Sequence, residues 1–187
     1  EKPANYFNGL FSYNIDLSSS SYEEDHTFSY QFSTDEEGYA QLIFWYGMSD
    51  DLYNISADID QSTGVAYWVM EGYNETNPEK FRIRTFSCYI DPELGTDWWN
   101  TDYNFGYLDD AIHPDVSAAG GTTYLAVEYI EGGFNHNILC YISNNDGASW
   151  EAVEVAATMD QETNPTIVAY PGGSASCIFT KGSDLYV

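Results

Sequence analysis

Basic residues are scarce in this sequence, which has five Lys and Arg against thirty Asp and Glu and a net charge of −25. Nucleic acids and anionic membrane surfaces are bound through Lys and Arg, so this composition excludes both as expected partners. It favours divalent cations, basic partners or a salty medium, although acidity can also serve solubility alone. Runs of about eighteen apolar residues are lacking too, and we therefore expect no membrane insertion.

Cysteine is also rare. Cys88, Cys140 and Cys177 are odd in number and none lies in a CxxC pair, so the sequence indicates neither a disulfide framework nor a zinc site. The first residues do not resemble a signal peptide. Two N-glycosylation sequons, at Asn54 and Asn74, favour a secreted or cell-surface protein.

Aromatic residues and internal repeats, by contrast, are abundant. Aromatic residues make up 17% of the chain and apolar residues 43%, which favours folded, half-buried β-strands over disorder. Residues 88–98 align with residues 140–150 without a gap, at an offset of 140 − 88 = 52, with Cys, Tyr, Ile, Gly and Trp identical. Short strands expected at 55–57, 116–118 and 167–169 repeat at intervals of 116 − 55 = 61 and 167 − 116 = 51 residues, a period typical of propeller blades.

The segment at 143–150 resembles the Asp-box, or BNR repeat, of sialidase-like β-propellers. Its matching positions are Ser143, Asn145 (in place of Asp), Gly147, Ser149 and Trp150, and a more degenerate copy has Glu93, Gly95 and Trp98. In such a box an Asx side chain bonds its own backbone, Gly takes a positive φ and Trp fills the gap between sheets. The resemblance implies an all-β fold of four-stranded antiparallel blades. It also implies that the boxes are structural fasteners, remote from the functional face.

The domain organisation follows from where the repeats occur. We expect residues 49–187 to form propeller blades, the last one truncated, and residues 1–48 to form a β-rich segment that is a divergent blade or a separate module. Typical propellers have four to eight blades. The expected fold is therefore an incomplete propeller, whose remaining blades come from the same longer chain or from another copy. The alternative fold is a β-sandwich.

In a propeller, the loops that lead into each innermost strand meet on one face, and here these loops are acidic in every unit. Together with the facing loops they supply the following candidate ligand-binding residues: Asp50, Asp51, Asp109, Asp110, His113, Asp115, Glu131, His136, Asp160 and Glu162. Converging acids would bind a cation or the hydroxyls of a sugar, with aromatic residues stacking on the sugar ring. The alternative is that these are ordinary turn residues of an acidic protein.

A second candidate site is a calcium loop at residues 58–64. Asp58, Asp60 and Ser62 place oxygen donors at alternate positions, as calcium loops do. The glycine comes one place late for an EF-hand, and the distant Glu of that motif is missing. A hairpin turn would also favour Asp, Ser and Gly at these positions.

Sialidase catalysis is not expected within this chain. Sialidases of the family that it resembles hold the substrate carboxylate with three arginines, whereas this sequence has only Arg82 and Arg84, two residues apart. We therefore predict an extracellular, non-catalytic module that binds glycans or a protein partner through an acidic, aromatic loop face. One alternative is part of a secreted glycoside hydrolase whose catalytic residues lie partly outside this chain. The other is a structural surface-layer or adhesin repeat.

Overall fold

The computed structural model describes residues 8–16, 25–33, 40–48, 52–74, 77–89 and 104–187. These residues form β-strands joined by turns and loops, and no helix occurs among them. In this part of the chain there is consequently no helix long and apolar enough to cross a membrane. The protein is all-β and built from antiparallel sheets, as the sequence predicts.

Each sheet is a meander in which consecutive strands pair antiparallel. The N-terminal sheet comprises β1 (Asn8–Asp16), β2 (Asp25–Ser33) and β3 (Ala40–Met48). The first four-stranded sheet, called the first sheet below, comprises β4 (Leu52–Asp60), β5 (Val65–Asn74), β6 (Asn77–Tyr89) and β7 (Asn104–Asp109). The second sheet comprises β8 (Ala111–Ala119), β9 (Thr122–Glu131), β10 (Asn135–Ser143) and β11 (Glu151–Ala156). The third sheet comprises β12 (Glu162–Tyr170), β13 (Ser174–Lys181) and β14 (Asp184–Tyr186).

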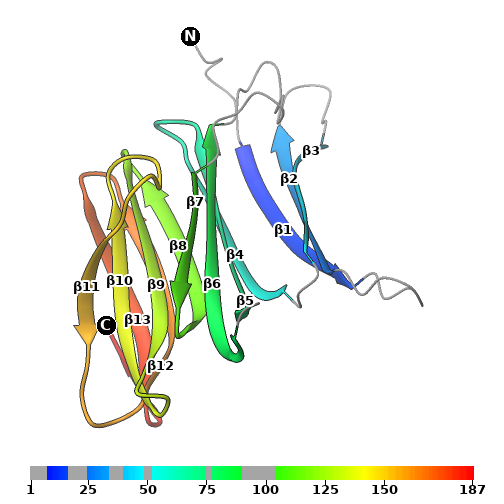
Figure 1. The fold of residues 1–187 in the computed structure, drawn as a ribbon. Coiled ribbons are helices and arrows are strands. Elements are labelled where there is room, and N and C mark those ends of the chain that lie inside the picture. Colours follow the sequence, from blue (N-terminus) through cyan, green and yellow to red (C-terminus); the bar gives the residue numbers. More distant parts are fainter. Residues whose placement is uncertain (1–7, 17–24, 34–39, 49–51, 75–76, 90–103) are drawn as a thin grey trace.

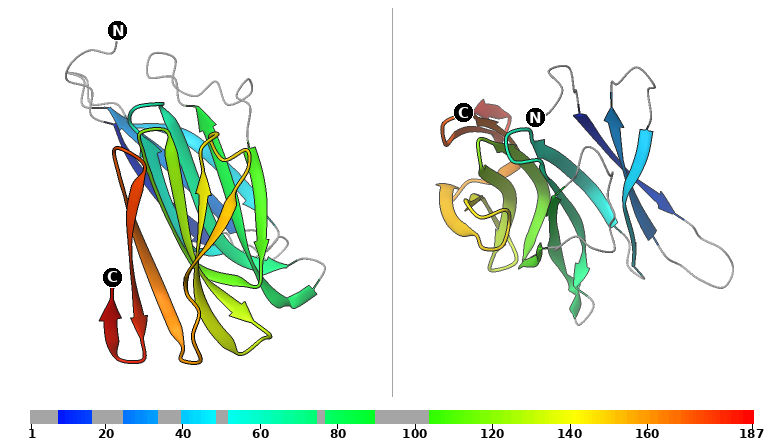
Figure 2. Two further views of the ribbon diagram at one scale, coloured as in Figure 1. Left: turned by 90° about the vertical axis from the view of Figure 1, so that its left-hand side faces the viewer. Right: turned by 90° about the horizontal axis from the view of Figure 1, so that it is seen from above.

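The four sheets stand in a row, with the N-terminal sheet at one end and the third sheet at the other (Figure 1 and Figure 2). The first strand of each sheet lies against the first strand of the next: β1 against β4, β4 against β8, and β8 against β12. Successive meanders stacked through their first strands are propeller-type blades. Among the described residues the row stays open, and the fold is an incomplete propeller.

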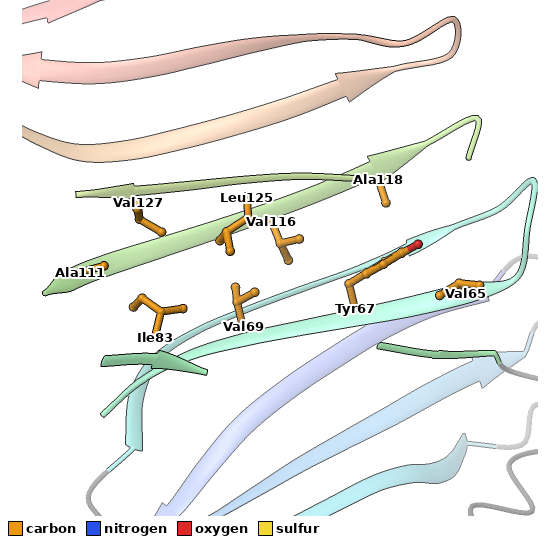
Figure 3. Close-up of a cluster of buried hydrophobic side chains, with 9 residues drawn as sticks. All are labelled: Val65, Tyr67, Val69, Ile83, Ala111, Val116, Ala118, Leu125 and Val127. Carbon is orange, nitrogen blue, oxygen red and sulfur yellow. The ribbon is translucent and has the colours of Figure 1, made fainter. Parts of the chain in front are cut away.

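The larger hydrophobic core lies between the first and second sheets, whose side chains point towards one another (Figure 3). Alternate residues of a strand share a face, which is why β5 contributes residues 65, 67 and 69 to this core. The buried members are Val65, Tyr67, Val69 and Ile83 from the first sheet and Ala111, Val116, Ala118, Leu125 and Val127 from the second.

A smaller apolar cluster joins the second and third sheets. Tyr124, Ala126 and Cys140 are buried there against Ile167, and Cys177 packs on them. Burial raises the pKa of the Cys140 thiol to about 12 and that of Cys177 to about 11. Both thiols are therefore protonated at neutral pH and pack as small apolar side chains.

The first strands of the three sheets share a bulge. In each one the pairing with the second strand shifts at the same place, just before residues 56, 115 and 166. Each bulge contains a non-glycine residue in the left-handed region, a conformation in which Asn and His are enriched. These residues are Asn54 (φ 49°), His113 (φ 49°) and Asn164 (φ 52°).

The positions of the bulges give the true spacing of the repeats, which differs in part from the spacing expected from the sequence. Equivalent residues are 113 − 54 = 59 and then 164 − 113 = 51 positions apart, so the expected spacing of 61 at the first step is wrong by two. Ser56 matches Asp115 in the structure, whereas the sequence alignment set it against Ser117. A shift of two residues leaves every side chain on the same face of the sheet. The alternation of apolar and polar residues therefore could not reveal the error.

Side chains of β4 accept hydrogen bonds from the backbone of β8. Ser56 Oγ accepts from Val116 N at 3.1 Å, and Asp58 Oδ2 accepts from Ala118 N at 2.9 Å. Neither strand has another backbone partner on this edge among the described residues. The side chains thus satisfy N–H groups that would otherwise be buried without a partner.

The same pattern joins β8 to β12. Asp115 Oδ2 accepts from Ile167 N at 2.8 Å, and Ser117 Oγ accepts from Ala169 N at 3.1 Å. The β4–β8 bonds and the β8–β12 bonds are themselves connected, since the hydroxyl of Ser56 donates to Asp115 Oδ1 at 2.7 Å. This set of bonds is the inter-sheet ladder.

The hairpin between β10 and β11 fastens the second sheet to the first. Ser143 Oγ accepts from Gly147 N at 2.9 Å, and Asn145 Oδ1 accepts from Ser149 N at 3.0 Å. Gly147 has a φ of 81°, and a Cβ there would lie 2.7 Å from Ser87 Oγ on β6. Trp150 packs against the core between the two sheets. Glu93, Gly95 and Trp98 lie outside the described residues.

Replacing Leu125 with Ala should lower the free energy of unfolding by roughly 2–5 kcal/mol, because its fully buried side chain leaves a cavity between two sheets. Met159→Ala is the control, since this side chain is almost fully exposed and its removal should cost less than about 0.5 kcal/mol. Urea denaturation followed by tryptophan fluorescence measures both. Equal losses would contradict the placement of Leu125 in the core.

Candidate functional site

The candidate site lies at one end of the sheets, called the loop end, which is the lower end in Figure 1. At this end β4, β8 and β12 begin, and the second strand of each of their sheets turns into the third (Figure 1). The bulges of β4, β8 and β12 are close to it. The Asp-box hairpin and the turns between first and second strands lie at the opposite end.

Two buried glutamates on the second strands hold the bulge of the next sheet. Glu71 Oε2 accepts from the backbone N of His113 at 2.9 Å and from Asn54 Nδ2 at 2.8 Å. Glu128 Oε2 accepts from the backbone N of Asn164 at 3.0 Å. Both glutamates are almost fully buried, where an unpartnered charge would be costly. Hydrogen-bond donors from two sheets supply the compensation.

Two imidazole rings also share the carboxylate of Glu128. His113 Nδ1 lies 2.9 Å from Oε2, and His136 Nδ1 is hydrogen bonded to Oε1. An ionised carboxylate only accepts hydrogen bonds, so both rings carry a proton on Nδ1. This leaves Nε2 of each ring for other partners, and no hydrogen bond to either Nε2 is found among the described residues. The side chains of His113 and His136 are 40% and 27% exposed, so the imidazole pair is accessible to a ligand.

The third sheet departs from this arrangement. At the position of the two glutamates it has Thr180, whose hydroxyl lies 2.8 Å from that of Thr163. Its own buried glutamate, Glu162, is on the first strand and accepts from Thr158 N at 3.3 Å. Glu162 Oε1 also lies 3.4 Å from Lys181 Nζ. The carboxylate at this place is therefore bound within its own sheet and its adjoining loop.

The loop that leads into β10, the strand of His136, carries exposed side chains. Phe134, in the loop between β9 and β10, is 77% exposed, and its carbonyl accepts from Gln161 Nε2 at 3.1 Å. Glu131 is exposed at the start of the same loop and accepts from Asn137 Nδ2 at 3.1 Å. The loop end thus has an exposed aromatic ring together with imidazole and carboxylate groups, which offer a stacking surface and hydrogen-bond partners to a polyhydroxylated ligand.

Only some of the sequence-predicted ligand residues meet at this place. His113 and His136 converge on Glu128, and Glu131 and Asp160 are exposed at the loop end. Glu162 lies at the same end but is buried. These positions make the loop end polar.

The remaining predicted ligand residues have other partners. Asp109 Oδ1 lies 2.7 Å from Arg82 Nε. Asp115 belongs to the inter-sheet ladder. Asp110 is a turn residue with a φ of 58°, and its carbonyl accepts from Ile130 N at 2.8 Å. Asp50 and Asp51 lie outside the described residues.

The sequence-based prediction missed Glu128, the residue on which the two rings converge. The feature that could have identified it in the sequence is that Glu128 is the single charged residue inside the otherwise apolar stretch 124–130 of β9. A carboxylate in such a stretch is buried with the strand and must therefore have partners. Glu71 occupies the equivalent place after a similar apolar stretch of β5, so comparing the two repeats could have found both.

The calcium-loop residues lie at the end opposite the imidazole pair. The carboxylate of Asp58 accepts from Ile59 N and Ala118 N, and that of Asp60 accepts from Ser62 and from Gly121 N. Among the described residues, no group of three or more His, Cys, Asp and Glu side chains is arranged to hold a metal ion. Calcium binding at Asp58, Asp60 and Ser62 stays a prediction from the sequence.

Fold and site together define an all-β protein of propeller-type blades with a polar and aromatic loop end. Neither a protein-family model nor a curated protein matches the sequence. Among solved structures, the chain is similar to one described as Hadza microbial sialidase Hz136, at 10% sequence identity and a TM-score of 0.35. The match covers 91% of this chain and 50% of that one, so this chain spans about half the length of that protein.

Glu128→Gln should lower the free energy of unfolding by about 1–3 kcal/mol, because an amide has one acceptor oxygen for donors that now share two. It should also free at least one imidazole to change tautomer, which ¹⁵N-edited NMR of the histidine rings detects. Glu131→Gln is the matched control, since Glu131 is exposed, and should leave both readouts near wild type. Unchanged ring tautomers in Glu128→Gln would show that Glu128 does not orient them.

Asp60→Asn should lower stability at neutral pH and lose its effect in acid. Burial alone would raise the pKa of Asp60, but hydrogen bonds from the Ser62 side chain and from backbone N–H groups, including that of Gly121, hold it below its usual 3.8. The wild-type advantage is therefore present above pH 3.8 and disappears as the pH falls through the folded-state value. Urea titrations across this range measure it, with the exposed Asp184→Asn as control. An advantage that persists in strong acid would refute the assignment.

Proposed function

We propose that this chain is a non-catalytic glycan-binding module, secreted or displayed at a cell surface, and that it binds sugars at the loop end. The observation that supports this most directly is the imidazole pair. Because Glu128 is hydrogen bonded to Nδ1 of both rings, Nε2 of His113 and of His136 is left to bond a ligand. Sugar hydroxyls both donate and accept hydrogen bonds, and they can therefore pair with these nitrogen atoms.

An aromatic platform beside the acceptors supports the same proposal. Phe134 lies two residues before His136 and is 77% exposed, although its ring would be expected to seek burial. A sugar stacked on this ring would cover its apolar face. The hydrogen bond from Gln161 to the Phe134 carbonyl ties the loop to the neighbouring loop, which reduces the entropy lost when a ligand orders it.

Charge favours a particular class of glycan. The chain carries a net charge of −25, and Glu131 and Asp160 are exposed around the site. A sugar with its own carboxylate would be repelled there. The ligand that fits best is therefore a neutral sugar or an amino sugar.

Binding to a glycan array that carries neutral, amino and sialylated sugars tests this function. We expect binding to neutral or amino sugars and none to sialylated ones. Phe134→Ala should weaken binding by about tenfold, the upper part of the range for one aromatic contact. Tyr170→Ala removes an aromatic side chain that is 46% exposed at the opposite end and should bind as the wild type does. Failure to bind any glycan, or equal loss in the two variants, would reject the proposal.

A further inference from the structure

β13 ends at the loop end with Lys181, whose ammonium contacts the loop between β11 and β12 and the start of β12. Its Nζ donates to Thr158 Oγ1 at 2.8 Å and lies 3.1 Å from Asp160 Oδ2 and 3.4 Å from Glu162 Oε1. The hydrogen bond with Asp160 raises the pKa of Lys181 above its usual 10.5, and the ammonium is therefore charged at neutral pH. One of the five basic residues of the chain is thus used at this place.

The other two sheets have no ion pair at the same position. Lys181 on β13 is directly opposite Glu162 on β12. By the register of the bulges, the equivalent pairs are Leu52 with Gly72 in the first sheet and Ala111 with Tyr129 in the second. Propeller-type sheets therefore form here without a cation at this position, and the fold alone does not account for Lys181.

Thr158 connects Lys181 to the rest of the loop end. Its hydroxyl accepts from Lys181 Nζ and from Asp160 N, at 2.8 and 3.2 Å, and donates to Glu162 Oε1. A hydroxyl has one proton and two lone pairs, so the hydrogen-bonding capacity of this group is fully used. The position of Thr158 is consequently fixed by three partners.

The loop that carries Phe134 is tied to this segment from both sides. Asn135 Nδ2 donates to the carbonyl of Thr158 at 3.3 Å, and Gln161 Nε2 donates to the carbonyl of Phe134 at 3.1 Å. A continuous series of hydrogen bonds therefore runs from Lys181 through Thr158 to the residue that follows Phe134. The third sheet reaches the β9–β10 loop of the second sheet by this route.

We propose that Lys181 is a positioning residue, which holds the β9–β10 loop and its exposed Phe134 ring in place from the neighbouring sheet. This inference rests on the proposed glycan binding at the loop end. A loop that is already held loses less conformational entropy when a ligand orders it. Lys181 therefore strengthens binding without touching the sugar.

The burial of Glu162 explains why the loop depends on the cation. Glu162 is fully buried, and removing one partner of a buried ion pair leaves an uncompensated charge. Without Lys181 this carboxylate has to move towards water or take up a proton. Either change disturbs its bonds with Thr158, and with them the attachment of Asn135.

Hydrogen exchange, measured by mass spectrometry on peptides covering residues 131–136, tests this inference together with the glycan array. In Lys181→Met we expect the loop amides to exchange about tenfold faster and array binding to weaken about tenfold, as the loss of roughly one hydrogen bond would cause. Lys181→Arg keeps a cation with several donors and should restore both readouts. Lys80→Met is the matched control, because it makes the same charge change on β6 of the first sheet, and should behave as the wild type does.

Unchanged loop exchange in Lys181→Met would overturn the inference, whether or not a glycan binds. Faster exchange with no loss of affinity would overturn it as well, because binding would then not need the loop to be held. If the wild type binds no glycan, the proposed function fails, while loop exchange still shows whether Lys181 holds the loop. If circular dichroism shows Lys181→Met to be unfolded, the double variant with Glu162→Gln, which removes the unpaired buried charge, takes its place.

Discussion

The fold depends on one constraint, which is that the first strand of each sheet is an edge strand buried against its neighbour. Backbone N–H groups on such an edge have no strand to pair with and lie away from water, where an unmade hydrogen bond is costly. Side-chain oxygens of the preceding first strand accept from these groups, as Asp58 does from Ala118 and Asp115 from Ile167. The spacing and register of neighbouring sheets follow from these bonds, because each bond requires a particular acceptor at a particular backbone position.

The candidate site is a consequence of the same constraint at the loop end. There the bulges of β8 and β12 each turn one N–H away from their own sheet, and a glutamate of the preceding sheet accepts from it. Once Glu128 is buried for this purpose, its remaining capacity to accept is satisfied by His113 and His136. A structural carboxylate thereby orients two partly exposed rings. The hydrogen bonds that hold neighbouring sheets together at the bulges therefore also position the candidate site.

Much of this fold can be predicted from the sequence, because the positions of Gly147 and Trp150 place strong local requirements on the residue type. A positive φ needs glycine, and a large ring needs a gap to fill, so the hairpin can be recognised from a few letters. The register between repeats was misjudged because a shift of two residues preserves the face of every side chain. Glu128 was missed for a different reason: its partners come from β8, β10 and β12, and no local pattern encodes contacts that distant. Asp115 was predicted to bind a ligand because the sequence alone does not distinguish an aspartate in an exposed loop from one in the inter-sheet ladder.

The scarcity of basic residues explains why backbone N–H groups have so large a part in this protein. With five Lys and Arg for thirty Asp and Glu, ion pairs can neutralise only a minority of the carboxylates. Buried acids must nevertheless have donors, and the unpaired N–H groups of buried edge strands need acceptors. The buried carboxylates serve as acceptors for the unpaired N–H groups, and these N–H groups serve as donors for the carboxylates. Asp60 illustrates the result, because N–H and hydroxyl donors lower its pKa despite burial, without a cation in contact. An acidic chain that stacks sheets through their edges can therefore bury carboxylates that an ordinary sandwich interface would exclude.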